Sequence, residues 1–379
     1  MFDYESLKLI WWLIIGILLI GFAVTDGMDM GVGSLLPFVA KDDTERRVVI
    51  NTIAAHWDGN QVWLITAGAS LFAAWPMVYG TAFSGFYFAM MLTLFCLFLR
   101  PLGFDYRSKI DSPKWRYNWD KALFVGSIVP PLVFGIAFGN LLQGIPFNFD
   151  ELMRVYTTGS FFALFNPFAL LSGVVSVSMI LMHGGTWLSM RTDEHVAARS
   201  AKAAQVFAAV LVVSFALAGV MIATTIDGYV IQSAIDTQAY AQPTNKVVTI
   251  VSGAWLNNFN SMPILWLLPI TGFVMAIVAG LLARFKPGGL AFTASALSIA
   301  GVILTMGVSM FPFIMPSSST PNHSLTIWDA VSSEGTLNLM LIVVAIFLPL
   351  ILCYTIWCYS KMWRTVTRSE IEENTHSSY

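Results

Sequence analysis

The sequence predicts an all-α polytopic membrane protein with nine transmembrane helices. Of its 379 residues, 56% are hydrophobic and only 11% are charged, whereas a soluble domain carries about 25% charged residues. Apolar runs long enough to cross a bilayer, about 20 residues each, recur along the whole chain between polar connections. We therefore treat residues 1–379 as one transmembrane domain that ends in a short polar tail at 361–379.

Nine candidate spans follow one another in the sequence. The first is too long for one perpendicular crossing, so we expect it to tilt or protrude, and the second is the least hydrophobic. The first also lacks the basic segment and the cleavage site of a signal peptide, so we interpret it as a retained span. In order, the spans cover residues 8–37, 50–73, 78–100, 121–143, 161–187, 202–224, 261–283, 290–313 and 335–360.

The basic residues predict the orientation of the chain, because cytoplasmic connections of membrane proteins are enriched in Lys and Arg. With nine spans, all of the 20 basic residues except Lys8, Arg154 and Lys246 fall on one side. We therefore expect the N-terminus outside and the C-terminus in the cytoplasm. The two long outside connections, 225–260 and 314–334, are rich in Gly, Asn, Ser, Pro and Trp. Such composition favours ordered caps over the helix ends, and a role in closing a site on that side stays open.

Three acidic residues lie within apolar spans, and we expect them to have partners. Asp26 and Asp29 are three residues apart, which places them on one helix face. Gly27 and Gly31 are interleaved with them in a GxxxG spacing, which lets a neighbouring helix approach closely. The acidic face of the first span should therefore pack against protein. The third acid, Asp58, lies in the second span.

The second and third spans add further ionisable groups at the same level. Along a continuous second helix, Asp58 would share a face with Gln61, and His56 would share one with Asn60. Arg100 ends the third span on the cytoplasmic side. Five ionisable groups thus fall in the cytoplasmic half of the membrane, namely Asp26, Asp29, His56, Asp58 and Arg100.

We interpret this cluster as a proton pathway. Carboxylates and histidines in a low dielectric have shifted pKa values, and ionisable residues inside a membrane mark proton or ion routes. The alternative is a salt-bridge network that only fixes helix packing, with Arg100 against Asp29 as the obvious pair.

The remaining residues favour a chain without its own redox chemistry. A membrane haem held by two histidines needs two deep ones; His56 is deep, whereas His183 is expected at the cytoplasmic edge of the fifth span. His56 itself is either a hydrogen-bonded interior residue or a haem ligand. The sequence contains no CxxCH, Walker loop or HExxH motif. We therefore assign no catalytic residue and no metal ligand to this chain.

Several long motifs resemble the second subunit of the cytochrome bd quinol oxidases, and the resemblance extends from Tyr4 to the tail. They are FAVTDGMDMGVG (22–33), HWDGNQVWLITAGASLFAAWPMVY (56–79), FSGFYFAM (83–90), RPLGFDYRSK (100–109), PPLVFGIAFGNLLQG (130–144), DGYV (227–230), FPFIMPSS (311–318) and SLTIWDA (324–330).

The resemblance implies a fold and an activity. The fold would be two four-helix bundles plus one peripheral helix. The enzyme would be a terminal oxidase of the bacterial cytoplasmic (inner) membrane that oxidises ubiquinol at the periplasmic side and reduces O₂ to water with cytoplasmic protons. Haem b and haem d would be ligated by the partner, subunit I. Subunit II would be haem-free and would bind a quinone or a phospholipid. Small single-span accessory subunits are expected, and no nucleic acid.

The resemblance also implies roles for particular residues. Asp58 would relay protons to haem d across the subunit interface, with support from Asp26, Asp29, His56 and Arg100. Asp105 would sit at the cytoplasmic mouth of this route, together with Arg107. Trp57 and Trp63 would lie at the interface, where Trp63 either borders an apolar route for O₂ or is a plain interface residue.

Two other functions remain open from the residues alone. One is a proton-coupled secondary transporter, although transporters tend to show inverted repeats with paired broken helices and none is recognisable here. The other is a purely structural partner whose polar cluster is inert.

Overall fold

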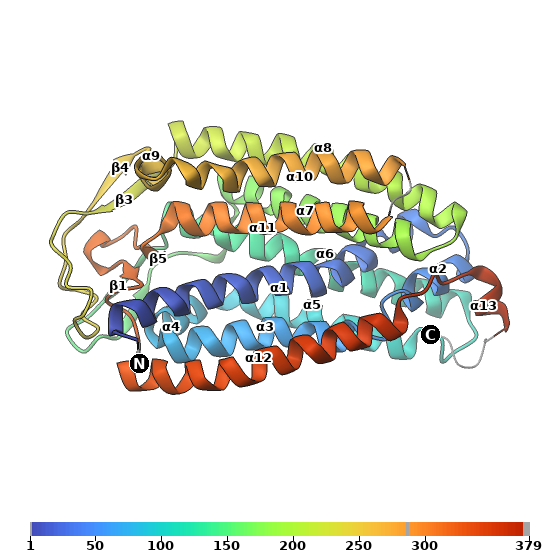
Figure 1. Cartoon of the computed structure of the whole chain (residues 1–379), viewed down its shortest axis with the longest axis horizontal. Coiled ribbons are helices and arrows are strands. Elements are labelled where there is room, and N and C mark those ends of the chain that lie inside the picture. Colours follow the sequence, from blue (N-terminus) through green and yellow to red (C-terminus); the bar gives the residue numbers. More distant parts are fainter. Residues whose placement is uncertain (1, 286–287, 374–379) are drawn as a thin grey trace.

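The computed structural model describes residues 2–285 and 288–373, most of them in long helices that lie side by side (Figure 1). The long helices are α1 (Tyr4–Val39), α3 (Trp57–Ala74), α5 (Tyr87–Tyr106), α6 (Pro113–Gln143), α7 (Pro167–Arg191), α8 (Glu194–Thr224), α10 (Leu267–Arg284), α11 (Gly288–Met310) and α12 (Glu334–Met362). The short ones are α2 (Asp43–Asn51), α4 (Pro76–Gly85), α9 (Asn257–Ser261) and α13 (Arg368–Glu373).

Three antiparallel strand pairs lie at one end of the helices (Figure 1). They are β1 (Phe147–Phe149) with β2 (Val155–Thr157), β3 (Asp227–Ile231) with β4 (Val248–Ser252), and β5 (Phe313–Met315) with β6 (Leu325–Thr326). Lys8 is fully buried at this end, and its ammonium donates to the backbone carbonyls of Thr237, Ala239 and Trp328. Both long connections are thereby tied to α1, which confirms the prediction of ordered caps.

Within the described residues, eight helices are long and apolar enough to cross a membrane, and the count reaches nine if the bent pair α3 and α4 is taken as one span. This bend of 118° lies in the link of residues 74–77 that was predicted between the second and third spans. It follows Trp75, whose φ of −131° and ψ of 72° leave the helical region, directly before Pro76. Proline cannot continue the hydrogen-bonding ladder of the preceding helix.

The predicted bounds of the second and third spans are therefore wrong. Residues 50–56 do not belong to the second membrane helix, because α2 ends at Asn51 and α3 begins at Trp57. The third predicted span, 78–100, is divided between α4 and α5, and α5 continues to Tyr106. Hydrophobicity is continuous across these breaks, so an apolar run alone does not reveal them.

The α1 helix is the centre of the helix packing. It contacts α3, α6, α7, α11 and α12. At Gly31 a Cβ atom would lie 2.3 Å from the backbone oxygen of Ile180 and 2.9 Å from the Cα of Gly184. The close approach predicted for the acidic face of the first span is confirmed.

The remaining helices form two groups of contacts around α1. The α5 helix packs on α6, whereas α10 packs on both α8 and α11, and all three contact α7. The α12 helix lies along α1 and α3 (Figure 1) and buries none of its most apolar window inside the chain.

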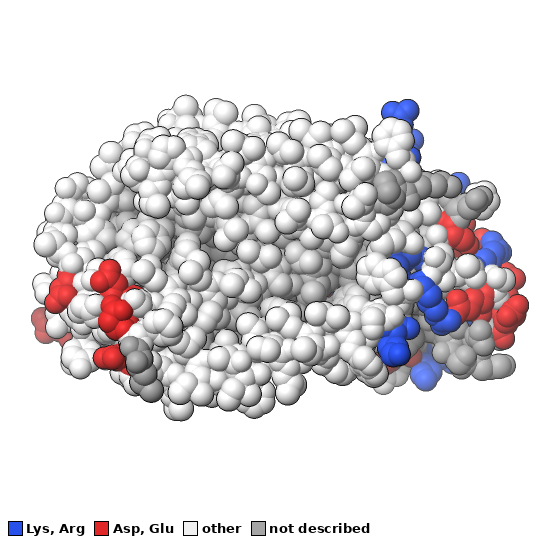
Figure 2. Space-filling view, in the orientation of Figure 1, with Lys and Arg blue, Asp and Glu red and all other residues white. Residues whose placement is uncertain are grey.

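Charged side chains gather at the two ends of the molecule and leave a broad uncharged middle (Figure 2). On the visible face, Lys and Arg are concentrated at the end that carries α2 and α13, which we call the basic end. The N-terminus and the C-terminus lie at opposite ends (Figure 1). An odd number of crossings requires this.

The polar composition of residues 370–379 predicts a solvated tail, and Glu372 and Glu373 are exposed as expected. Ile371 of α13 is instead 2% exposed and packs with Val48 of α2, and Val366 before this stretch forms an isolated bridge with Thr192. Arg368 also lies 3.1 Å from Asp42. Lys286, one of the basic residues used to predict the orientation, and residues 374–379 of the tail lie outside the described part of the chain.

Candidate functional site

The first part of the site is a buried ion pair between α1 and α5. The two guanidinium nitrogens of Arg100 lie 2.6 and 3.1 Å from the two carboxylate oxygens of Asp26, and neither residue is exposed. Sequence reasoning paired Arg100 with Asp29 instead. Both acids lie on the α1 face that was predicted, but only Asp26 lies directly opposite Arg100.

The second part joins α1, α3 and α12 through Asn60. Its amide nitrogen lies 2.7 Å from the Asp29 carboxylate and 2.9 Å from the Tyr359 hydroxyl, and the hydroxyl lies 3.1 Å from the Asn60 oxygen. The His56 ring stacks on the Tyr359 ring at 4.6 Å, and His56 Nδ1 lies 3.8 Å from Asp29. We call Asp26, Asp29, His56, Asn60, Arg100 and Tyr359 the inner cluster.

Three atoms of the inner cluster are buried without a hydrogen bond among the described residues, namely Asp29 Oδ1, His56 Nε2 and Arg100 Nε. Most buried polar atoms in proteins are hydrogen-bonded to protein or to ordered water. All three are therefore positions where the cluster can hold a water molecule, and Asp29 Oδ1 and His56 Nε2 can also take a proton.

Sequence reasoning did not assign roles to Asn60 and Tyr359. Asn60 was recognised as sharing a face with His56, which the 3.2 Å contact between them confirms. Tyr359 was missed because 299 residues separate it from Asn60. The only signal in the sequence is a phenol hydroxyl near the cytoplasmic end of an otherwise apolar span.

Asp58 does not join the inner cluster. It is exposed in the first turn of α3 and has no hydrogen bond or ion pair among the described residues. The reason is helical geometry, because two residues before Asn60 is about 200° around the helix. Asp58 begins an exposed stripe on α3 that continues through Val62, Ile65, Ala69 and Phe72, which we call the α3 stripe.

The predicted interface tryptophans occupy different environments. Trp63 is buried against α1, where its ring covers Gly21 so closely that a Cβ there would lie 2.3 Å away. Trp57 is half-buried and packs on Phe104 of α5 at 5.2 Å. Neither side chain therefore belongs to the α3 stripe.

His183 lies deeper than predicted, because α7 continues eight residues beyond it to Arg191. It is fully buried, with Nδ1 2.6 Å from the Ser295 hydroxyl and Nε2 2.9 Å from the Val24 carbonyl. The chain thus has a second deep histidine, but both of its ring nitrogens already have partners.

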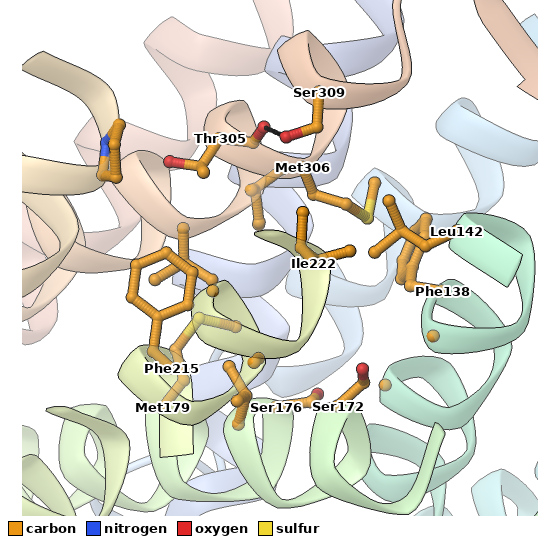
Figure 3. A pocket seen from close by; sticks show the side chains of 18 of the residues that line it. Phe138, Leu142, Ser172, Ser176, Met179, Phe215, Ile222, Thr305, Met306 and Ser309 are labelled. Carbon is orange, nitrogen blue, oxygen red and sulfur yellow. Dashed lines mark hydrogen bonds between the residues drawn. The ribbon is translucent and has the colours of Figure 1, made fainter. Parts of the chain in front are cut away.

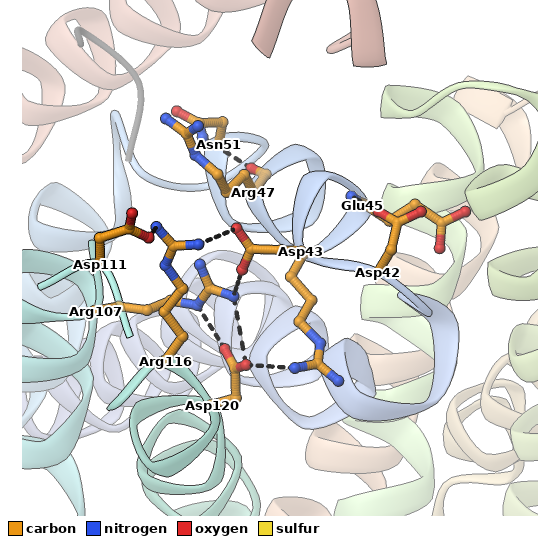
Figure 4. A network of polar contacts seen from close by, with 10 residues as sticks. Asp42, Asp43, Glu45, Arg47, Asn51, Arg107, Asp111, Arg116 and Asp120 are labelled. Atoms are coloured by element: carbon orange, nitrogen blue, oxygen red, sulfur yellow. Dashed lines mark hydrogen bonds and ion pairs between the residues drawn. The ribbon is translucent and has the colours of Figure 1, made fainter. Parts of the chain in front are cut away.

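A network of charged residues joins α2 to α6 and to the end of α5 at the basic end (Figure 4). Buried Arg107 lies 2.6 Å from Asp120 of α6 and 2.8 Å from Asp43 of α2. Asp43 also pairs with Arg116, and Asp120 with Arg46. Asp105 is exposed in the last turn of α5 and has no hydrogen bond or ion pair within the described chain.

An apolar pocket of about 600 Å³ lies between α1, α6, α7, α8, α10 and α11 (Figure 3). The hydroxyls on its wall include Ser172, Ser176, Thr305 and Ser309, and each donates to a backbone carbonyl. The pocket therefore presents mainly hydrocarbon to an occupant. In the described part of the chain, no three His, Cys, Asp or Glu side chains could jointly hold a metal ion.

Comparison with known proteins gives consistent matches over the full length. Residues 7–362 match the family model described as cytochrome bd terminal oxidase subunit II. The chain is 59% identical over 379 residues to cytochrome bd-I ubiquinol oxidase subunit 2 of Escherichia coli (strain K12), covering 100% of both chains. It is 31% identical over 369 residues to cytochrome bd ubiquinol oxidase subunit 2 of Bacillus subtilis (strain 168), covering 96% of this chain and 98% of the other.

The solved bd oxidase of Geobacillus thermodenitrificans has a similar fold. The TM-score is 0.68 at 16% identity, and the match covers 94% of this chain and 99% of that chain.

Proposed function

The chain belongs to the cytochrome bd terminal oxidase subunit II family, and from that premise we propose that it is the haem-free subunit of a ubiquinol oxidase. The complex oxidises ubiquinol and reduces O₂ to water in the bacterial inner membrane. Haem b and haem d are held by subunit I, the partner of this chain, and small single-span subunits complete the assembly. Membership of the family does not favour the alternative of a proton-coupled transporter.

The proposed orientation places the basic end in the cytoplasm, in line with the enrichment of Lys and Arg in cytoplasmic connections. The N-terminus and the three strand pairs then face the periplasm. The helix contacts support two four-helix bundles, one of α1, α3, α5 and α6 and the other of α7, α8, α10 and α11, with α12 as the peripheral helix.

The observation that carries the proposed proton pathway is the carboxylate of Asp58 on an apolar exposed face. Its neighbour Asn60 bonds to Asp29, ten residues before the end of α1, or about 15 Å at 1.5 Å per residue. Asp58 therefore lies below the end of the molecule, at the depth of the apolar helix surface, and it shares the α3 stripe with Val62 and Ile65. A charge facing lipid at depth costs about 2.5 kcal/mol or more.

We infer that subunit I covers the α3 stripe and that Asp58 passes cytoplasmic protons to the haem d site across this interface. Protons arrive past Asp105 and the charged network around Arg107. The inner cluster lies on the opposite side of α3 from Asp58 and supports it by hydrogen bonding and charge. In this cluster Arg100 pairs with Asp26, and Asn60 links Asp29 to His56 and Tyr359. Trp57 packs between α3 and α5 beside this route, and Trp63 fixes α3 on α1.

The apolar pocket is the proposed site for a quinone tail or an acyl chain of a phospholipid. It is enclosed by helices of both bundles, and its hydroxyls are occupied by backbone carbonyls. Ligand pockets commonly measure about 300–1,000 Å³ and are mainly apolar. Its 600 Å³ fall within this range.

The test is oxygen consumption by the purified complex with ubiquinol as donor. Asp58→Asn should lower turnover at least about tenfold, because positioned acid–base groups contribute about 10²–10⁴-fold, while the haem spectrum stays normal. Asp58→Glu should retain most activity because it keeps a titratable carboxyl. Asp111→Asn is the matched control, since the Asp111 side chain is 94% exposed outside the membrane. Normal turnover of Asp58→Asn with intact haems would remove the proposed relay.

A further inference from the structure

A second groove lies on the outside of the helices, towards the basic end. It measures about 490 Å³ and is lined by α1, α6, α7 and α8. Its floor and walls are mainly apolar, with Leu35, Phe38, Phe124, Val206 and Phe207 among the lining residues. It shares no residue with the apolar pocket, and α8 contacts α7 and α10 rather than the α3 helix that carries Asp58.

Two cations of α8 line the same groove. Arg199 donates through Nε to the Val39 carbonyl at 2.6 Å, and its Nη2 lies 2.6 Å from Glu45. A quarter of the Arg199 side chain is exposed. Lys202, three residues further along the same helix, is exposed and has no hydrogen bond or ion pair with any described residue. With one carboxylate against two cations, the groove keeps a net positive charge.

A buried hydroxyl gives an independent sign of a ligand. Ser34 lines the groove and is 1% exposed, yet its Oγ has no hydrogen-bond partner among the described residues. Leaving a buried donor unpaired is unfavourable, because the group has lost its hydrogen bonds to water. An acceptor oxygen supplied from within the groove would remove this cost.

We propose that this groove binds an anionic phospholipid. An acyl chain lies along the apolar floor, the phosphate lies between Arg199 and Lys202, and an ester oxygen accepts from Ser34. A soluble anion would satisfy the cations but would leave the apolar floor exposed. Basic pockets between membrane helices at the cytoplasmic side are suited to lipid headgroups. The inference rests on this groove alone and is independent of the proposed proton pathway.

The test uses the delipidated, purified oxidase complex, titrated with phosphatidylglycerol or with phosphatidylethanolamine and followed by native mass spectrometry. Lys202→Gln should weaken phosphatidylglycerol binding about fivefold, the effect of one basic residue beside an anionic lipid. Binding of zwitterionic phosphatidylethanolamine should not change. Val206→Trp, which fills the groove, should remove the same binding event without removing a charge.

Arg284→Gln is the matched control. Arg284 is an exposed cation at the last residue of α10, but it does not line the groove. Its phosphatidylglycerol binding should equal that of the wild type. Equal losses in Lys202→Gln and Arg284→Gln would overturn the site, as would binding that Lys202→Gln and Val206→Trp leave unchanged. Occupation by quinone or by phosphatidylethanolamine with the same affinity as phosphatidylglycerol would also overturn it.

Discussion

At the scale of single residues, the inner cluster places complementary charges next to one another in the buried interior between the helices. Arg100 and Asp26 satisfy each other with two parallel hydrogen bonds and are both fully buried. A buried ion pair tolerates the loss of both charges better than the loss of one, because a single remaining charge is left without compensation. This asymmetry distinguishes a packing pair from a group that needs to titrate.

We predict that Arg100→Gln destabilises the chain by about 3–5 kcal/mol and that Asp26→Asn in the same chain restores part of the loss. Thermal unfolding of the purified complex, followed by tryptophan fluorescence, measures both variants. The double variant should unfold at a higher temperature than Arg100→Gln alone. Additive effects of the two substitutions would show that these side chains do not interact.

A second prediction concerns Asp42, which caps α2 outside the membrane. The pKa of Asp42 is lowered because the Glu45 backbone N–H donates to its carboxylate at 2.9 Å and because Arg368 lies nearby. A carboxyl with a lowered folded-state pKa stabilises above its unfolded pKa, near 3.9. This stabilisation is lost as the pH falls through the folded pKa.

Hydrogen exchange of the α13 amides, compared between the wild type and Asp42→Asn, tests this dependence. At pH 7 the variant should exchange faster, and the difference should vanish as the pH falls below about 4. A difference that persists under acid would show that the Asp42 charge is not what holds α13 on α2.

At the scale of elements, α1 and α7 approach each other through glycine. Gly31→Ala should destabilise the chain by about 1–3 kcal/mol, because its Cβ would lie 2.3 Å from the Ile180 carbonyl oxygen. Gly16→Ala in the same helix is the control, since no atom lies within 4 Å of its Cβ. Thermal unfolding of the complex compares the two. Equal effects would mean that the close approach does not limit packing.

The sequence predicted the helices well and their ends less well. The nine predicted apolar runs agree with the eight to nine candidate membrane helices, because burial in lipid requires length and apolarity. The orientation predicted from Lys and Arg stays a prediction. The break at Trp75 lies in the predicted link between the second and third spans, whereas the breaks around Thr52–His56 and at Phe86 depend on local backbone geometry and were not predicted. His183 was placed near a helix end because the predicted span stops at residue 187, whereas α7 continues to Arg191.

The site was predicted in part for a related reason. Spacing along one helix placed Asp26 with Asp29 and His56 with Asn60, since both pairs lie within a turn. Contacts between helices, such as Asn60 with Tyr359 and Arg100 with Asp26 rather than Asp29, depend on how whole helices pack.

At the scale of the whole molecule, the two ends differ in charge, and this difference predicts the topology. Tyr240→Cys, at a site 76% exposed in the 225–260 connection, should react with a membrane-impermeant maleimide in intact cells. Ile110→Cys, 48% exposed between α5 and α6, should react only after permeabilisation. The opposite pattern would reverse the orientation and place Asp58 on the wrong side for cytoplasmic protons.

The central claim is that cytoplasmic protons cross into the partner subunit through Asp58. Proton uptake during a single reaction of the reduced complex with O₂, followed with a pH indicator, measures this transfer directly. Asp58→Asn should slow uptake at least about tenfold, whereas Asp111→Asn should match the wild type. Uptake at the wild-type rate in Asp58→Asn, with haem content unchanged, would contradict the claim.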